Sequence, residues 1–368
     1  MNYTSIILVV LLLAFAGGIF VFLQGRKFDL PRGETLPFAQ VGAEENDLPA
    51  GNVAAQAEDG EISGPSGESG TSSGVITSAR SNREIFVTDG TKHSIPLNEI
   101  LSGGPGKDGI PSIDNPKFLS ASGAAFLESS DIGLGLTVEG ESRFYPYRIL
   151  VWHEIVNDTV GGEPVLVTYC PLCATGVVFD RRVGGEVQEF GVSGLLWQSN
   201  LLMYNRAGSE DKESLWSQVL GEAVLGVDTG EKLSIIRSDV VRWSDWRKGH
   251  PDTKVLSNDT GVSRDYGRDP YGNYYTSESV SFGASFSDTR LHPKELVHGV
   301  EIDGLFKAYH DPALKVGTTN DTFAGKTVSI KKTSSGEITF SANGQPLPSI
   351  PGFWFSWIAV HPETELFF

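Results

Sequence analysis

Short apolar runs separated by turn residues dominate residues 82–368. The runs 133–138 and 142–147 flank a Glu-Gly-Glu turn, and this pattern predicts a β-hairpin. The runs 176–180 and 187–192 flank a Gly-Gly turn and predict a second hairpin. With 43 Gly and 19 Pro in the chain, the pattern indicates many short antiparallel strands joined by tight turns.

Helical spacing is confined to a few short segments. Apolar residues in 148–156 recur at helical offsets up to a turn signal at Asn157-Asp158, and 241–248 predicts a helix that ends before Gly249-His250-Pro251. A short helix is also expected within 94–104. Further strands are expected at 164–169, 223–227, 233–236, 327–331 and 337–340. No internal repeat is evident, and the expected fold class is a β-rich α+β domain with few short helices.

The N-terminal segment has a different pattern. After a short end at 1–5, residues 6–23 carry no charge and are almost entirely apolar. Their number is close to the ~20 residues with which an α-helix crosses a bilayer. We therefore expect a single-pass transmembrane anchor. Arg26 and Lys27 follow it and, by the positive-inside tendency, favour a cytoplasmic C-terminal side. This tendency is statistical, and we nevertheless expect export, because the long acidic segment that follows is easier to explain as a spacer that holds a domain off an outer membrane surface.

Residues 24–81 are rich in Gly, Ser and acidic side chains and cannot bury enough apolar surface to offset the entropy of ordering. We expect them to be a disordered acidic tether that holds a globular domain, 82–368, outside the cytoplasm at the cell membrane. A cleaved signal peptide is the alternative, because Ala14-Phe15-Ala16 matches the small-x-small pattern of cleavage sites. The apolar run continues to Leu23, which cleavage would not require.

Charge narrows the choice of partners. The formal net charge is −17, and nucleic-acid binding relies on Lys and Arg to displace counterions, so no nucleic-acid partner is expected. The expected partners are the membrane, through the N-terminal helix, and a redox, metal-donor or surface protein whose identity the sequence does not indicate.

The two cysteines of the chain form one Cys-Pro-Leu-Cys motif, Cys170 to Cys173, directly after the predicted strand 164–169. Three interpretations stay open. The pair forms a structural disulfide in an oxidising compartment; it is a catalytic pair for thiol–disulfide exchange; or it binds a soft metal. No surrounding βαβ pattern supports a thioredoxin-like fold.

Further ligands for a soft metal lie nearby in sequence. His153 and Met203 complete a candidate metal set with Cys170 and Cys173, and these donors suit copper, or zinc without the methionine. The alternative for His153 is a packed histidine satisfied by a backbone group. The alternative for Met203 is core filling.

Polar clusters that could line a pocket are also present, although each is compatible with ordinary turn chemistry. They contain Asp180, Arg181, Ser193, Asn200, Trp216, Gln218, Arg264, Tyr266 and Arg268. The sequence contains no P-loop, dinucleotide fingerprint, His-Glu-x-x-His, EF-hand or Gly-x-Ser-x-Gly motif. These enzyme classes therefore have no sequence support.

Several motifs together resemble one prokaryotic family. They are 151–158, 168–173, 178–181, 190–196, 214–218, 266–271 and the closing motif 355–364. In combination they resemble the DUF3179 family, whose function is unknown, over about Ile95 to Phe368. Asn205 stands where that family usually has an aspartate, and 207–213 is longer than its usual connection, so the resemblance implies no carboxylate role at position 205.

The sequence thus leaves two hypotheses. The first is soft-metal binding or thiol–disulfide chemistry at the cell surface, with His153 near both sulfurs. The second is a non-catalytic surface module for protein or glycan binding, in which the cysteines form a staple and aromatic loops make the contacts.

Overall fold

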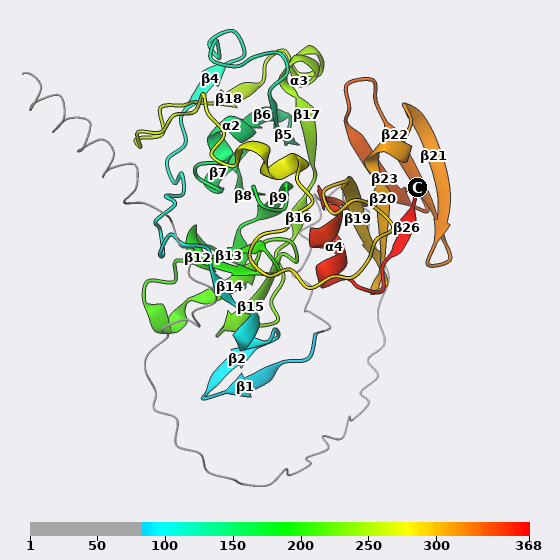
Figure 1. Ribbon diagram of the computed structural model, residues 1–368. Coiled ribbons are helices and arrows are strands. Elements are labelled where there is room, and N and C mark those ends of the chain that lie inside the picture. Colours follow the sequence, from blue (N-terminus) through cyan, green and yellow to red (C-terminus); the bar gives the residue numbers. More distant parts are fainter. Residues whose placement is uncertain (1–82) are drawn as a thin grey trace, which may run out of the picture. The chain divides into compact units, whose positions relative to one another are not determined.

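The computed structural model describes residues 83–368 (Figure 1). The expected anchor and tether, 6–23 and 24–81, lie outside the described residues. Among residues 83–368, every helix falls short of the length and apolarity that crossing a membrane requires. The helices are α2 (Tyr147–Leu150), α3 (Trp243–Gly249) and α4 (Trp354–Val360), with 3-10 turns at Leu97–Glu99, Glu210–Lys212, Gly272–Thr276 and Asp311–Ala313. The remaining regular structure is β, so the expected β-rich fold with antiparallel strands and few short helices is confirmed.

Two sheets have the same order of strands and the same helical connection to a parallel strand. In the five-stranded sheet β17-β5-β6-β18-β4, the hairpin β5–β6 is flanked by antiparallel β17, and α3 then leads to β18, which runs parallel to β6. In the four-stranded sheet β25-β19-β20-β26, the hairpin β19–β20, antiparallel β25, α4 and parallel β26 repeat this order. The strands are β4 (Phe118–Ser120), β5 (Ile132–Val138), β6 (Glu141–Pro146), β17 (Ser238–Arg242), β18 (Lys254–Leu256), β19 (Leu296–Ile302), β20 (Leu305–His310), β25 (Ile350–Phe353) and β26 (Glu365–Phe367).

A second pair of sheets extends the correspondence. The meander β7–β8–β9 follows α2 in the first unit, and the meander β21–β22–β23 follows the 3-10 turn after β20 in the second. Each meander leads to a small hairpin, β10–β11 or β23–β24. The strands are β7 (Ile155–Val160), β8 (Glu163–Cys170), β9 (Thr175–Asp180), β10 (Arg182–Val183), β11 (Glu186–Val187), β16 (Ile235–Ile236), β21 (Gly317–Phe323), β22 (Lys326–Lys332), β23 (Ile338–Ala342) and β24 (Gln345–Leu347). β16 adds a fourth strand beside β9.

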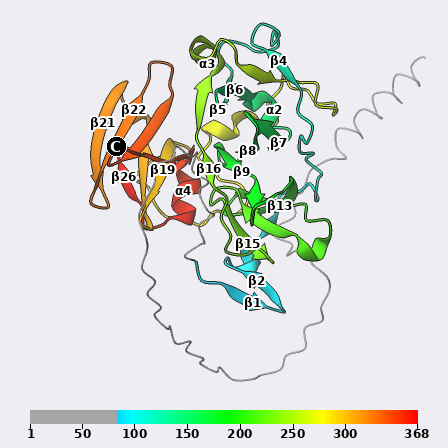
Figure 2. The same cartoon turned by 180° about the vertical axis from the view of Figure 1, so that it is seen from behind.

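Matching side chains occupy matching places in these two units. The motif Trp-x-x-Trp-x-x-x-His-Pro-x-Thr occurs at 243–253 and again at 354–364. In both copies the second indole donates to the final threonine, at 3.0 Å and 2.9 Å. In both it also lies against a glycine of the hairpin, on β5 and on β19. The helix that carries the indole, α3 or α4, contacts the same strand, β5 or β19 (Figure 2). The expectation of no internal repeat was therefore wrong; the repeat lies in short motifs and turn conformations.

A long insertion interrupts the first unit between β11 and β16. It follows β11 and supplies four strands of a seven-stranded sheet, β1-β2-β15-β14-β13-β12-β3. The strands are β1 (Phe86–Thr88), β2 (Thr91–His93), β3 (Leu101–Ser102), β12 (Phe190–Trp197), β13 (Asn200–Asn205), β14 (Ser214–Ser217) and β15 (Glu222–Gly226). The insertion has no counterpart between β24 and β25, which are joined directly.

The two units contact each other reciprocally. The turn after β8 in the first unit accepts a backbone hydrogen bond from the second, Phe353 N to Cys173 O at 2.8 Å. Directly after the turn that follows β22 in the second unit, Ile338 N donates to a side-chain oxygen of the first unit, Asp239 Oδ1, at 3.0 Å. Each turn therefore lies at the boundary between the units, and Cys173 belongs to one of them.

Two predicted elements were wrong. The segment 148–156 contains only part of the single turn α2, and β7 begins at Ile155, because Ile155 and Val156 pair with β8 and are buried on a sheet. Asn157 and Asp158, expected in a turn, lie inside β7. The run 187–192 does not pair with 176–180; β9 pairs with β8 and β16, and 190–197 joins the seven-stranded sheet. Tertiary pairing decides both cases.

Candidate functional site

The two cysteines lie in the turn that joins β8 to β9. Cys170 is the last residue of β8 and is paired with Thr175, the first residue of β9. Ala174 closes the turn with φ +48°, a left-handed conformation. Both thiols are free, and both residues are buried, Cys170 with 2% and Cys173 with 0% of its surface exposed. The structural disulfide of the second hypothesis is therefore not present.

Both sulfurs converge on one oxygen atom. The carbonyl oxygen of Ser199, from the insertion, lies 3.2 Å from Cys173 Sγ and 3.9 Å from Cys170 Sγ. Burial raises the pKa of the Cys170 thiol. Burial also acts against ionisation of Cys173, but donors around it, the Cys170 thiol, Ser356 and Asn200, outweigh burial and lower the pKa of Cys173. Cys173 is therefore the thiol that loses its proton first.

The insertion braces this turn with a chain of buried amides. Asn200 Nδ2 donates to Gln218 Oε1 at 2.9 Å, and Gln218 Nε2 donates to Thr175 O at 2.9 Å and to Thr168 Oγ1 at 3.0 Å. Asn200 and Gln218 were both predicted as pocket residues, and the structure brings them to the cysteines. Their hydrogen bonds fix the position of the turn against β13.

A segment rich in tyrosine packs over the same apolar cluster. Tyr271, Tyr274 and Tyr275, in and beside the 3-10 turn Gly272–Thr276, contact the cluster that contains both cysteines, Met203 and Trp216. Lys294 holds this segment through hydrogen bonds to Tyr274 O, Ser277 Oγ and Ser279 O. We call residues 271–286 the cover. Because the sulfurs are buried, a reagent reaches them only when a surrounding segment moves, and the cover is one such segment.

Several polar groups beside the sulfurs lack partners. Within residues 83–368, the buried hydroxyls of Tyr147, Tyr274, Tyr275, Ser199 and Ser356 have no partner at normal hydrogen-bond distance and angle. Ser356 therefore acts on Cys173 only as a long, weak donor. Buried polar groups are normally satisfied, so a concentration of unsatisfied hydroxyls indicates a place prepared for chemistry or for a small polar guest.

Glu154 brings a carboxyl group to the site. It directly precedes β7, and its carbonyl oxygen accepts Tyr169 N at 2.8 Å, which places it opposite the residue before Cys170. Burial raises the pKa of Glu154 well above the ordinary range, and Cys170 raises it further. The sequence analysis did not predict Glu154 as a site residue, because the candidate metal-ligand set included its neighbour, His153.

In the structure, the ring of His153 has partners other than the sulfurs. Its Nδ1 lies 2.7 Å from Pro111 O and must carry the proton, so Nε2 accepts from the Tyr266 hydroxyl at 2.7 Å. Burial lowers the pKa of His153, which keeps the ring neutral. Both nitrogens are thus engaged with groups other than the sulfurs, so the ring has no free nitrogen for the cysteines or for a metal.

The donors present do not form a metal cage. Within residues 83–368 no group of three or more His, Cys, Asp and Glu side chains is arranged to hold a metal ion. Met203 is buried in the same apolar cluster as the two cysteines. Zinc requires at least three protein ligands, which this set does not supply. The predicted set of His153, Cys170, Cys173 and Met203 is therefore corrected to a pair of thiols beside a thioether.

The other predicted pocket residues have structural partners elsewhere. Asp180 pairs with Arg182, and Arg181 donates to Asp158 O and Gln188 O. Ser193 donates to Leu202 O at an irregularity of the β12–β13 pairing. The Arg268 carbonyl accepts a hydrogen bond from the Trp152 indole, Arg264 donates to the Ser263 carbonyl, and the Trp216 indole donates to Asn205.

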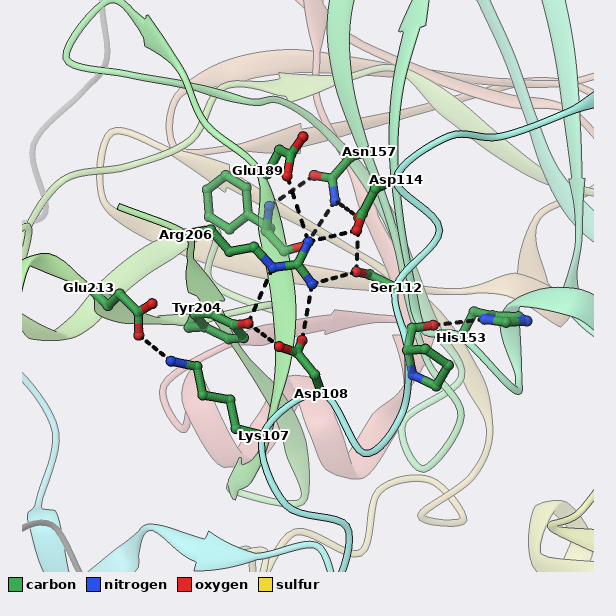
Figure 3. A network of polar contacts seen from close by, with 12 residues as sticks. Lys107, Asp108, Ser112, Asp114, His153, Asn157, Glu189, Tyr204, Arg206 and Glu213 are labelled. Atoms are coloured by element: carbon green, nitrogen blue, oxygen red, sulfur yellow. Dashed lines mark hydrogen bonds and ion pairs between the residues drawn. The ribbon is translucent and has the colours of Figure 1, made fainter. Parts of the chain in front are cut away.

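A second polar network surrounds Arg206 (Figure 3). Its guanidinium binds Asp108 at 3.0 Å, Asp114 at 2.8 Å and Ser112 at 2.9 Å, and Nε donates to the Tyr204 hydroxyl. Burial and the hydrogen bond to Asp108 raise the pKa of Tyr204 to about 12. The donors of Arg206 are all engaged, so this network fastens the loop that carries Pro111, and with it His153, to β13.

One protein family matches the part of the chain that contains the thiol turn. The family model described as "Protein of unknown function (DUF3179)" matches residues 107–345. The chain belongs to the DUF3179 family. The matched range contains the thiol turn, Glu154 and the cover, and it ends before the closing motif expected at 355–364. No curated protein and no solved structure matches the chain.

The unusual asparagine of this DUF3179 domain has a structural role. Asn205 Oδ1 accepts from Ser214 N and from the Trp216 indole, while Nδ2 donates to Asp228 at 3.1 Å. An aspartate here would place two carboxylates together. The amide provides both a donor and an acceptor, so position 205 stabilises the β13–β14 pairing next to the site.

Proposed function

We propose that this DUF3179 domain carries out thiol–disulfide exchange through Cys170 and Cys173. The observation that supports the proposal is the convergence of two free sulfurs on the single carbonyl oxygen of Ser199. Because the two thiols are already held close together, little entropy is lost when they form a disulfide with each other. This disulfide is therefore favoured over one with an outside molecule.

Charge favours this chemistry over soft-metal binding. The thiol pKa values are set by burial and by the interactions of the two thiols with each other and with Ser356, Asn200 and Glu154. None of these side chains carries a positive charge. Copper(I) with two thiolates carries one net negative charge, and burying an uncompensated ion costs several kcal/mol. Zinc with two thiolates is neutral, but residues 83–368 do not supply the further protein ligands that it requires. The dithiol and the disulfide are both neutral, so the same interior accommodates either.

The difference between the two thiols assigns their roles. Cys173, whose pKa is lowered, attacks one sulfur of a partner disulfide as the thiolate and expels the partner's other sulfur as a thiolate. Cys170 then loses its proton and attacks Cys173, and the second partner thiolate leaves. The pair thereby gives two electrons and two protons to a protein or small-molecule disulfide.

The proposal includes a location. An anchor at 6–23 would hold the domain outside the cytoplasm, in a compartment where disulfides persist. A fusion of a reporter that is active only outside the cytoplasm to Phe368 tests the location. Activity of this reporter supports the proposal. An inactive reporter, together with activity of a second fusion whose reporter works only in the cytoplasm, overturns it.

The chemistry is tested on the full-length chain in glutathione buffers of graded redox potential. Thiols are counted at each potential by maleimide labelling and mass spectrometry, after unfolding. We expect one reversible transition in which Cys170 and Cys173 lose two hydrogens together, and no transition in Cys173→Ser. Thiols that stay reduced throughout, or copper or zinc retained at one ion per chain against a chelator, would overturn the proposal.

A further inference from the structure

Within residues 83–368, the longest strand at the edge of a sheet is β21, Gly317–Phe323. All seven of its residues pair with β22 on one side, and Figure 1 shows β21 as the outermost strand of this sheet. Proteins usually protect such an edge with lysine, proline or a bulge, because its free backbone groups can pair with another strand. β21 has none of these three features, so its edge is available for pairing.

β21 corresponds to β7 of the first unit. Both strands contain the sequence Asn-Asp-Thr, at 157–159 and at 320–322, and each leads into a two-residue turn with positive φ angles. Counted from that turn, both strands pair with the next strand in the same register. Alternate residues of an edge strand direct their backbone groups away from the sheet, so Asn157 N and Asn320 N have the same outward direction.

In the first unit, an extended segment of the chain covers the edge of β7. Ile113 N donates to Ile155 O, and Ile113 O accepts from Asn157 N, each at 2.9 Å. The segment runs parallel to β7, and Ile113 is buried, with 4% of its surface exposed. The side chain of Asn157 fastens the next residue, because its Nδ2 donates to Asp114 Oδ1 at 2.7 Å. The segment that fits this edge therefore has an apolar residue followed by a carboxylate.

The same groups are uncovered in the second unit. Thr318 O and Asn320 N correspond to the two backbone groups that bind Ile113, and no other strand of residues 83–368 pairs with this side of β21. Asn320 is exposed, and in this part of the chain its side chain has no hydrogen-bond partner. β21 therefore has the binding groups of β7 without the segment that they bind.

Two lysines give this edge a positive charge. Lys331 lies opposite Thr318 on β22, and Lys315 lies just before β21. Both lysines are exposed, and neither forms an ion pair with another described residue. Side chains of directly opposed residues project to the same face, so Lys331 shares the face of Thr318 and Asn320. A carboxylate held beside Asn320 is attracted by these charges, whereas a basic segment is repelled.

We propose that β21 binds an extended segment of a partner polypeptide, which runs parallel to the strand and contains an apolar residue followed by an acidic one. The apolar residue donates its N–H to Thr318 O and accepts from Asn320 N, as Ile113 does on β7. The acidic side chain accepts from the Asn320 amide, on the face that carries Lys331. Main-chain hydrogen bonds supply the affinity of such strand addition, and side-chain contacts supply its specificity. This function is separate from the chemistry of the thiols.

A second copy of β21 fits this edge less well. Residues 317–323 contain one carboxylate, Asp321, which already binds Lys307 at 2.7 Å. Pairing between two copies of β21 therefore brings no carboxylate to Lys315 or Lys331.

The test uses a synthetic peptide with the sequence of residues 109–116, Gly-Ile-Pro-Ser-Ile-Asp-Asn-Pro. Isothermal titration calorimetry measures its binding to the full-length chain. We expect one peptide to bind per chain, and binding to weaken about tenfold when the aspartate of the peptide is replaced by asparagine. No saturable binding at ~1 mM peptide, or equal binding of the two peptides, would overturn the proposal.

Asn320→Pro locates the site. It removes the outward N–H and the side-chain amide together, and an edge strand tolerates proline where the nitrogen faces away from the sheet. We expect binding to weaken about tenfold or more. Lys331→Gln should weaken binding about threefold, whereas Lys248→Gln, the same change at an exposed position of α3, should leave it unchanged.

Asn320→Ala covers the case in which Asn320→Pro does not fold, because it removes only an exposed amide and should still weaken binding about threefold. Unchanged affinity in both Asn320→Ala and Lys331→Gln would place the peptide elsewhere and overturn the proposal. A dimer of the full-length chain in sedimentation that Asn320→Pro converts to a monomer would show self-pairing and overturn it as well. None of these outcomes depends on the redox state of Cys170 and Cys173, so the proposed function is tested separately.

Discussion

The Cys173 sulfur lies 3.2 Å from the carbonyl oxygen of Ser199. This contact joins the thiol turn of the first repeat unit to the inserted sheet, and Phe353 N, from the second unit, binds the carbonyl of the same cysteine. Three parts of the chain that are distant in sequence therefore meet at Cys173. Sites at such junctions can respond to small movements of any one part.

Removing the Cys173 thiol should weaken this junction. Cys173→Ala loses the donor to Ser199 and leaves a small void, and we expect the free energy of unfolding to fall by about 1–3 kcal/mol. Urea unfolding of the full-length chain in reducing buffer measures the change. Cys173→Ser keeps a donor and should lose less; equal losses in the two variants would contradict the importance of the hydrogen bond.

The two repeat units predict a matched pair of glycine substitutions. A methyl group at Gly135 would overlap the Trp246 indole, and one at Gly299 would overlap the Trp357 indole. We expect Gly135→Ala and Gly299→Ala each to lower the free energy of unfolding by about 1–3 kcal/mol or more, because neither ring can retreat from a packed core.

Gly249→Ala serves as the control for this pair. A Cβ at Gly249, at the end of α3, meets no atom within 4 Å, and helix propensity favours alanine. Its thermal and urea unfolding should match or exceed those of the wild type. Destabilisation as large as that of Gly135→Ala would show that the indole contacts are not the cause.

Release of the cover should expose the thiols. Lys294→Met removes three hydrogen bonds to the cover, and we expect the rate of reaction of Cys170 and Cys173 with a maleimide to rise about tenfold or more, equivalent to about 1.4 kcal/mol of lost closure. Lys315→Met, at an exposed position, should react at the wild-type rate. An unchanged rate in Lys294→Met would mean that another group controls access.

His361 predicts a loss of stability in acid. Burial, with contributions from Arg83 and Lys232, lowers the pKa of His361 to about 3, while the unfolded chain has the ordinary value of about 6.5. The unfolded state therefore binds the proton first, and stability is full above the unfolded pKa and falls as the pH drops from about 6.5 toward about 3.

Between pH 7 and pH 5 this histidine alone should lower the free energy of unfolding by about 2 kcal/mol. Urea unfolding at the two pH values measures the loss, which His361→Gln should reduce and His292→Gln, at an exposed histidine, should not. An equal loss in wild type and His361→Gln would contradict the buried, neutral state of the ring.

Local sequence determined several parts of this protein. A glycine turn predicts the hairpin after β5, alternation predicts the strands within 327–340, and helical spacing predicts α3. Each of these signals acts over a few residues. The family followed from short motifs. The cysteine pair and the polar clusters that contain Asn200 and Gln218 could be singled out in the sequence because these residue types are chemically distinctive.

Only the tertiary structure decided what surrounds the sulfurs. His153 is nearer to the cysteines in sequence than Ser199 or Ser356, yet its ring binds Pro111 and Tyr266, while the two serines come to Cys173 from an insertion and from the second repeat unit. The likeness of those units was also missed: the motif at 243–253 and 354–364 is present in the sequence, but the shared order of strands and the indole–glycine contacts arise only from pairing between distant strands. Spacing along the chain fixes what a residue can do, but long-range packing fixes its neighbours.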